Sequence, residues 1–147
     1  SQLDRFLVRL ELGYPDRDAE LALLAAGGQR ERAAELQPLL SAADIPALQG
    51  AAASTHAAPP LLAYVQALVD ASRRQTGFQH GLSPRAGLGL LAVARAWAWL
   101  EGRDMVLPDD VQTALPAVAC HRLRSAQGGD HATPEDIAAL IRSVPIP

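Results

Sequence analysis

An arginine near the start of a helix is the residue of this chain best placed to do chemistry. Ser83 is of a type that caps helices through its side-chain oxygen, and Pro84 suits the first helical position because its missing N–H costs nothing there. Arg85 then lies beside unpaired backbone N–H groups, at the positive end of the helix dipole. Such a place favours an anion, above all a phosphate, whose oxygens match the planar guanidinium fork. The alternative interpretation is a solvated arginine after an ordinary cap.

The other reactive side chains do not have the spacing of a catalytic or metal site. Asp109 and Asp110 are adjacent, so on a helix their side chains diverge by roughly 100° and cannot share one site. His121 and His131 lack partners at metal-ligand spacing, and we expect them to be solvated or structural. Cys120 lies in an apolar stretch and is predicted to be a small core residue. We therefore expect no metal site and no hydrolytic enzyme.

The composition indicates one helical, globular domain. The chain has 147 residues, of which 49% are hydrophobic and only 4% aromatic. Its 13 basic residues are all arginine, against 16 acidic residues, so a dedicated nucleic-acid binder is not expected. A P-loop needs a lysine and is therefore excluded within this sequence. A single cysteine and the lack of a signal peptide or membrane-length apolar run favour a cytoplasmic location.

The hydrophobic periodicity predicts a mainly α fold, with one short strand followed by about six helices. Residues 6–12 alternate, with Phe6, Val8, Leu10 and Leu12 on one side, which is the pattern of a strand. One strand cannot satisfy its own backbone groups, so it must pair outside this chain or lie as an orphan against the helices. The chain also begins with Ser1 rather than methionine, and we expect it to be a fragment or an excised domain.

Helix starts and stops recur along the rest of the chain. Helices are expected from Asp16 to the glycines at 27–28, from Ser41, over about 60–76, over 83–101, from Pro108 and from Thr133. Pro116 is expected to kink or split the helix that contains it. In the helix over 83–101, the predicted buried face consists of Leu90, Val93, Trp97 and Leu100.

Several short motifs occur together in one order. They are Gln-Leu-Asp-Arg-Phe at 2–6, Leu-Gly-Tyr-Pro at 12–15, Ser-Pro-Arg-Ala at 83–86, Gly-Arg-Asp at 102–104, Val-Leu-Pro-Asp-Asp-Val at 106–111 and His-Arg-Leu at 121–123. Their order and spacing resemble the C-terminal portion of MoxR-family AAA+ ATPases, as does the ending Val-Pro-Ile-Pro. The resemblance covers essentially the whole chain, and it implies a helical-bundle lid domain preceded by the end of the AAA+ core.

The resemblance implies a role for four residues. Arg5 corresponds to the arginine finger, which reaches the nucleotide of the neighbouring subunit, and Arg85 corresponds to sensor 2, which touches the γ-phosphate in its own subunit. Tyr14 and Pro15 correspond to the hinge between core and lid, near the adenine. Residues 1–13 would then be the end of the AAA+ core and residues 14–147 the helical lid.

The resemblance further implies an ATPase that uses ATP and Mg²⁺ in the intact protein, forms a homo-oligomeric ring such as a hexamer, and assists the maturation of partner proteins. Those partners often carry von Willebrand factor A domains. Its own N-terminal AAA+ core would be the first partner of this chain. Because the P-loop, Walker B acid and sensor 1 are absent from the sequence, we expect the fragment alone to be non-catalytic, with no cofactor of its own.

Two other classes of function stay open at this point. A free-standing helical interaction module would explain the missing P-loop and the tryptophans at 97 and 99. A helix-turn-helix DNA binder would use residues 104–124, although the net charge of −3 opposes it.

Overall fold

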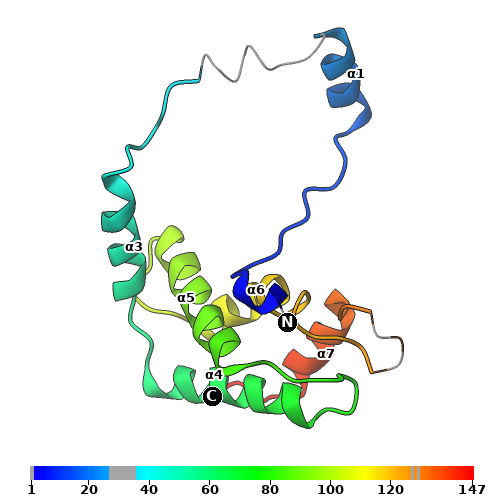
Figure 1. Ribbon diagram of the computed structural model, residues 1–147. Helices are drawn as coiled ribbons and strands as arrows, with labels where there is room; N and C mark the ends of the chain where they lie inside the picture. Colours follow the sequence, from blue (N-terminus) through cyan, green and yellow to red (C-terminus); the bar gives the residue numbers. More distant parts are fainter. Residues whose placement is uncertain (1, 27–35, 127, 129) are drawn as a thin grey trace.

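The computed structural model describes residues 2–26, 36–126, 128 and 130–147. The described chain is helical, as the composition predicts (Figure 1). Its elements, in chain order, are the 3-10 helix η1 (Gln2–Arg5) and the α-helices α1 (Arg17–Ala25), α3 (Asp44–Ser54), α4 (Pro59–Arg74), α5 (Pro84–Leu100), α6 (Pro108–Ala119) and α7 (Pro134–Arg142). The predicted end of the first helix at Gly27 and Gly28 lies outside the described residues.

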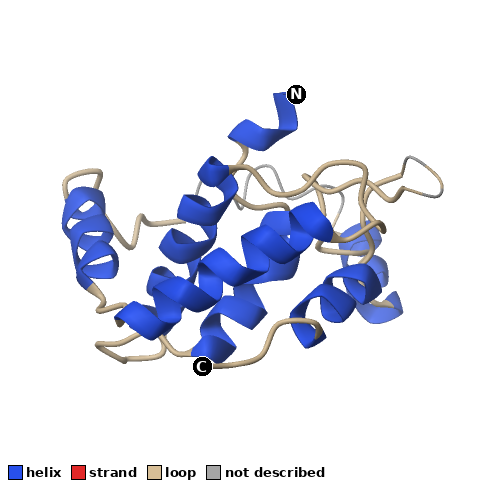
Figure 2. Ribbon diagram, turned by 90° about the horizontal axis from the view of Figure 1, so that it is seen from below, coloured by secondary structure: helices blue, strands red, loops and turns tan. Residues whose placement is uncertain are grey.

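Figure 2 shows the described chain as packed helices joined by loops. The core is formed where α4, α5, α6 and α7 pack together, with the α5–α6 interface the most extensive. Each of these four helices begins with a proline in its first turn, preceded by an extended residue, so their N-termini are sharply defined. The largest fully buried apolar side chains are Leu68, Leu82, Leu90, Leu115, Leu123, Ile137, Leu140, Val111 and Val118. These residues form one continuous core, which makes the bundle a rigid support for the loops at its ends.

The buried face of α5 differs from the predicted one. It consists of Ala86, Leu90, Ala94 and Ala98, whereas Trp97 is 43% exposed and Leu100 is 71% exposed. Alanines at this spacing allow close helix packing, and the most extensive packing of α5 is against α6. The prediction of Leu90 was correct, Val93 is partly buried against the core, and the predictions of Trp97 and Leu100 were wrong.

The predicted strand over residues 6–12 is not formed. The segment is extended, but its residues are exposed and no strand is assigned among the described residues. Its Arg9 N–H donates to the carbonyl of Ala117 at 2.9 Å, so the segment bonds to α6 instead of to a sheet. A strand needs a neighbouring strand to exist, and the described chain offers none.

Pro116 does not split its helix, because α6 continues to Ala119. The proline removes one hydrogen bond, the one that its own N–H would donate to the carbonyl four residues earlier, and the Cys120 N–H still donates to the Pro116 carbonyl at 3.0 Å. Of the two expected effects of Pro116, a kink or a split, the split does not occur.

An arm consisting of residues 10–26 and 36–45 extends away from the bundle, and α1 lies within it (Figure 1). All described residues of the arm are exposed, including several leucines of α1. Asp16 caps α1 by accepting from the Ala19 N–H at 2.8 Å, and the helix starts where the sequence predicts one from Asp16. In the described part of the chain, no helix is long and apolar enough to cross a membrane. The same residues include no group of three or more acidic, histidine or cysteine side chains placed to hold a metal ion.

Candidate functional site

The N-terminus of α5 has the cap that the sequence predicts. Ser83 is extended, and its Oγ accepts from the Ala86 N–H at 3.1 Å. Pro84 occupies the first turn, and Arg85 follows it with an exposed side chain. Among the described residues, the Arg85 guanidinium has no ion pair or hydrogen bond. A free guanidinium beside a helix N-terminus is therefore presented to solvent, which is the arrangement that an anion requires.

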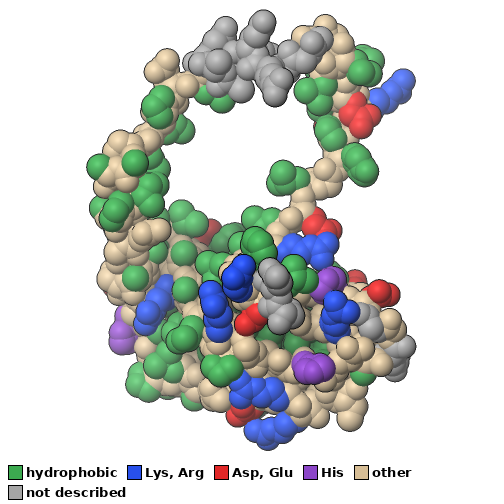
Figure 3. All heavy atoms as spheres, viewed as in Figure 1, with side chains coloured by type: hydrophobic (Ala, Val, Ile, Leu, Met, Phe, Trp, Pro, Cys, Tyr) green, Lys and Arg blue, Asp and Glu red, His purple; other side chains and the backbone are tan. Residues whose placement is uncertain are grey.

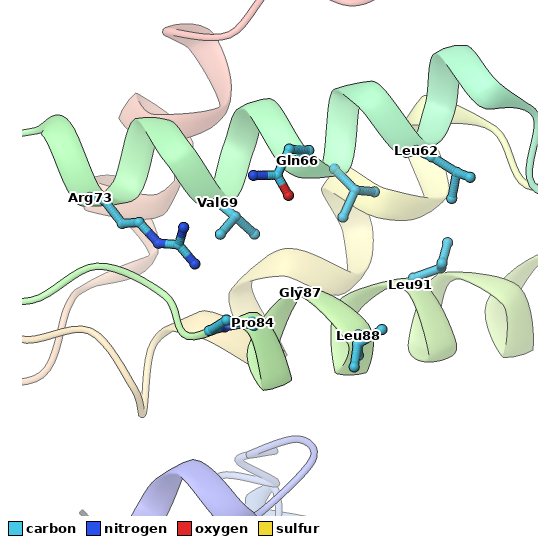
Figure 4. A pocket seen from close by; sticks show the side chains of 9 residues that line it. Leu62, Gln66, Val69, Arg73, Pro84, Gly87, Leu88 and Leu91 are labelled. Carbon is cyan, nitrogen blue, oxygen red and sulfur yellow. The ribbon is translucent and has the colours of Figure 1, made fainter.

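Helix α4 fixes the loop that leads into this cap. The buried Ser72 Oγ accepts from the Leu82 N–H at 2.9 Å, and Arg73 Nε donates to the Leu82 carbonyl at 2.9 Å. Figure 4 shows Arg73 reaching from α4 toward the chain that precedes Pro84, at one end of a groove of about 430 Å³ between α4 and α5. Both backbone groups of Leu82, its N–H and its carbonyl, are thus hydrogen-bonded to side chains of α4.

The η1 segment holds the same cap from the other side. Ser83 Oγ lies 3.2 Å from both carboxylate oxygens of Asp4 and donates to them. Asp4 also receives a hydrogen bond from Arg122 Nε at 3.1 Å, which forms an ion pair. Asp4 and Arg122, which are far apart in the sequence, therefore meet at the start of α5.

His121 and Arg122 bind the backbone that follows Asp4. The Arg122 guanidinium donates to the carbonyl of Phe6 at 2.5 Å and to that of Leu7 at 3.0 Å. His121 Nε2 lies 3.0 Å from the same Phe6 carbonyl. Burial lowers the pKa of His121, although its hydrogen bond to Phe6 acts in the opposite direction. The imidazole is therefore neutral at pH 7, and its Nε2–H donates to the Phe6 carbonyl. Of the two roles expected from the sequence, solvated or structural, His121 has the structural one.

The predicted site residues lie on two sides of this contact. Arg5 follows Asp4 directly and is exposed, with no partner for its guanidinium among the described residues. Arg85 lies two residues beyond Ser83 on α5. Basic side chains gather around the start of the chain on this face (Figure 3). The fold thus brings the segment of Arg5 and the segment of Arg85 together through Asp4 and Ser83.

Tyr14 and Pro15 lie elsewhere, on the arm. Tyr14 is 95% exposed, and Pro15 is exposed as well. Gly13 precedes them with φ at +67°, a conformation that glycine adopts without strain, so the chain changes direction here. The described residues do not bring Tyr14 or Pro15 into contact with the α5 cap.

One ion pair with a buried carboxylate was missed from the sequence. Arg103 donates two hydrogen bonds to Asp110, at 2.6 and 2.5 Å, and Asp110 also accepts from the Leu107 N–H at 2.7 Å. Burial alone would raise the pKa of Asp110, but these hydrogen bonds outweigh it and lower the pKa. The motifs Gly-Arg-Asp and Val-Leu-Pro-Asp-Asp-Val contained the signal, since they place an arginine and a helix-starting acid on either side of a short turn.

Comparison with known proteins places this arrangement in a family. The model for the AAA lid domain matches residues 70–137, which include the α5 cap, the Arg103–Asp110 turn and Arg122. The chain is 37% identical to "Chaperone MoxR1" of Mycobacterium tuberculosis over 132 residues, covering 84% of this chain and 34% of that protein. It is 30% identical to "Protein MoxR" of Paracoccus denitrificans over 167 residues, covering 98% of this chain and 49% of that protein.

The chain belongs to the MoxR family of AAA+ proteins. It matches the C-terminal portion of that family, with the lid domain as its helical bundle.

The fold supports the same assignment. The crystal structure of a "putative ATPase" from Cytophaga hutchinsonii superposes with a TM-score of 0.85 at 26% identity, covering 99% of this chain and 48% of that one. The fold class expected from the sequence, a helical AAA+ lid, is therefore correct, apart from the strand. This MoxR-family chain spans about a third to a half of the length of the relatives named here.

Proposed function

We propose that this chain is the lid of a MoxR-type AAA+ ATPase and that Arg85 senses the γ-phosphate bound in its own subunit. The observation that carries the proposal is the Arg85 side chain, which is exposed and unpaired among the described residues at the N-terminus of α5. Most other arginines of the bundle are committed to carboxylates or carbonyls, for example Arg73, Arg103 and Arg122.

The residues at the α5 N-terminus fit a phosphate. Ser83 Oγ and its carbonyl already occupy the N–H groups of Ala86 and Gly87, which leaves the Arg85 N–H and guanidinium for a ligand. ATP with Mg²⁺ would supply the phosphoryl group to be transferred, and Arg85 would bind a γ-phosphate oxygen and orient it. Because Arg85 lies on the lid, binding there would couple the position of the lid to the nucleotide.

Arg5 is proposed to serve the neighbouring subunit as an arginine finger. Its exposed guanidinium is available to another chain, and negative charge spread over a phosphoryl group is stabilised by such a residue by several kcal/mol. Each site would then be shared between two subunits of a ring, for which we propose a hexamer. Residues 1–13 would belong to the core and residues 14–147 to the lid, with Tyr14 and Pro15 at the hinge, near the adenine.

The biological role proposed for the intact protein is chaperone-like maturation of partner proteins in the cytoplasm. The name "Chaperone MoxR1" of the mycobacterial relative supports it. Partners with von Willebrand factor A domains are proposed from the family resemblance. In this role the lid converts ATP binding and hydrolysis into movement against the client.

The test is the substitution Arg85→Ala in the full-length protein that contains this chain. We expect kcat for ATP hydrolysis to fall by about 100-fold or more, because one pre-positioned donor to the developing charge is lost. Arg142→Ala, which removes an exposed arginine from α7, is the matched control and should leave kcat unchanged. Equal turnover of the Arg85 variant and the control would refute the assignment.

A further inference from the structure

Asp4 occupies a central position between the two proposed ATP-site arginines. Its carboxylate accepts from Ser83 Oγ at 3.2 Å, on the cap of α5, and from Arg122 Nε at 3.1 Å, beyond the end of α6. Arg5 is the next residue on one side of this contact, and Arg85 lies two residues beyond Ser83 on the other. The side-chain contact between Asp4 and Ser83 therefore connects the segments of the two arginines.

Arg122 holds the backbone around Arg5 with an almost completely buried side chain, 5% exposed. Besides the Asp4 carboxylate, it donates to the carbonyls of Asp4, Phe6 and Leu7 and to that of Val118 at the end of α6. Only a guanidinium has five N–H donors in one plane, so lysine could not replace this set of bonds. Asp4 is 36% exposed, so its ion pair with Arg122 contributes little by itself. The contact is rigid because Arg122 donates to several acceptors at once.

The segment is also seated on α5 by close packing. A Cβ at Gly89 would lie only 3.0 Å from the Leu7 Cδ1 atom, so the small residue on α5 makes room for Leu7. The Arg9 N–H donates to the Ala117 carbonyl at 2.9 Å. Residues 4–9 are thus bound to α5 and α6 along their length, although they precede the hinge proposed at Tyr14 and Pro15.

We propose that Asp4 and Arg122 are positioning residues that make Arg5 and Arg85 move as one unit. When Arg85 responds to the nucleotide of its own subunit, the Ser83–Asp4 contact would carry that movement to Arg5 and hence to the nucleotide of the next subunit. This inference rests on the proposed function of both arginines. In this inference, the network of Asp4, Ser83 and Arg122 provides the communication between successive ATP sites of the ring.

The experiment compares Asp4→Ala, Arg122→Lys, Arg5→Ala and the double variant Asp4→Ala/Arg5→Ala in the full-length protein. We expect Asp4→Ala and Arg122→Lys to lower kcat by about 10-fold or more, because small misplacements of a catalytic group are costly, while the Kd for ATP stays within about twofold. The double variant should be no slower than Arg5→Ala alone, since Asp4 acts through Arg5. Asp109→Ala, an exposed acid of α6, is the matched control.

The outcomes separate the inference from the proposed function. Full turnover in Arg5→Ala would refute the role of Arg5 as a finger, whatever Asp4 does. Reduced turnover in Arg5→Ala together with wild-type turnover in Asp4→Ala and Arg122→Lys would overturn the inference alone, as would losses that multiply in the double variant.

Amide hydrogen exchange tests the network without ATP. In Asp4→Ala and Arg122→Lys we expect the Arg9 amide, which bonds to Ala117, to exchange at least about 10-fold faster than in the wild type. The core amide of Leu115 should keep its protection. Unchanged exchange at Arg9 in both variants would show that the network does not hold this segment.

Discussion

Asp110 shows how one buried carboxylate fixes the turn between α5 and α6. It is 3% exposed and receives hydrogen bonds from both nitrogens of the Arg103 fork and from the Leu107 N–H. The carboxylate thus closes the turn and also satisfies an N–H group at the start of α6. Its neighbour Asp109, which has the same charge, is exposed.

Asp110→Ala is expected to lower the free energy of unfolding by about 2 kcal/mol at pH 7, because a charged, multiply bonded group is lost. The folded protein lowers the pKa of Asp110, so the unfolded chain takes up the proton first as the pH falls. The stabilisation is therefore complete above the pKa of the unfolded carboxyl, about 3.9, and is lost as the pH falls through the lower folded value.

Urea unfolding at pH 7 and in steps down to pH 3 checks this prediction. The difference between wild type and Asp110→Ala should shrink at the acidic end, and Asp109→Ala should remain close to the wild type throughout. A difference that does not depend on pH would show that the pair with Arg103 is not its source.

At the scale of the elements, the loop between α4 and α5 depends on Gly81. A Cβ there would lie 2.5 Å from Cα and 2.7 Å from N of Arg73, which are backbone atoms of α4 and cannot give way. Gly81→Ala must therefore displace the loop that holds Leu82 and the Ser83 cap. The position of Arg85 depends on this close approach.

Gly81→Ala is expected to destabilise the protein by about 1–3 kcal/mol, as overpacking does, and to reduce ATP turnover of the full-length protein beyond the loss of folded molecules. Gly77→Ala is the matched control, since a Cβ at that position would meet nothing within 4 Å. Thermal unfolding and turnover are measured on both variants. A Gly81→Ala protein as stable and active as Gly77→Ala would contradict the role of the close approach.

Local signals predicted the helices well where a start carries its own cap, whereas the helix expected from Ser41 begins at Asp44, after Ala43, which provides no side-chain cap. Ser83 with Pro84 and Thr133 with Pro134 begin helices where the sequence places them, and both hydroxyls accept the expected N–H bonds. The buried face of α5 could not be predicted from hydrophobicity, because Ala94 and Ala98 are buried for their small size and not for their apolar area. Tertiary contact, not periodicity, decides such faces.

The individual residues of the candidate site could be predicted from the sequence, but the contacts that connect them could not. The cap chemistry of Ser83 indicates Arg85, and the family resemblance adds Arg5. Nothing in the spacing of Asp4 and Arg122, more than a hundred residues apart, indicates that they pair. The prediction of a strand over 6–12 was wrong for a related reason. Alternating apolar and polar residues indicate an extended segment with two different faces, but they do not indicate whether a partner strand exists.

At the scale of the whole molecule, the arm of residues 10–26 and 36–45 stands out from the compact bundle. Leu12, Leu24 and Leu39 are 99%, 79% and 97% exposed. Apolar surface of this extent is typical of a face that contacts another protein surface. In the proposed ATPase that surface would belong to the AAA+ core.

The 147-residue chain on its own is therefore expected to self-associate through the arm. Sedimentation velocity over a range of concentrations should show species larger than the monomer, and Leu12→Ser/Leu24→Ser should shift the population toward the monomer. Leu100→Ser, at an exposed position of α5, is the control and should not. A strictly monomeric wild type at high concentration would contradict this prediction.

The central claim is that Arg85 acts within its own subunit and Arg5 on the next, and mixing of subunits tests it most directly. Full-length Arg5→Ala and Arg85→Ala proteins, each inactive alone, are mixed and allowed to exchange subunits, and ATP turnover is measured. An Arg5→Ala subunit keeps its own Arg85 and can receive Arg5 from an Arg85→Ala neighbour. In a ring mixed at random in equal amounts, about a quarter of the sites should regain both arginines, and turnover should recover accordingly. A mixture as inactive as its two components would contradict the account.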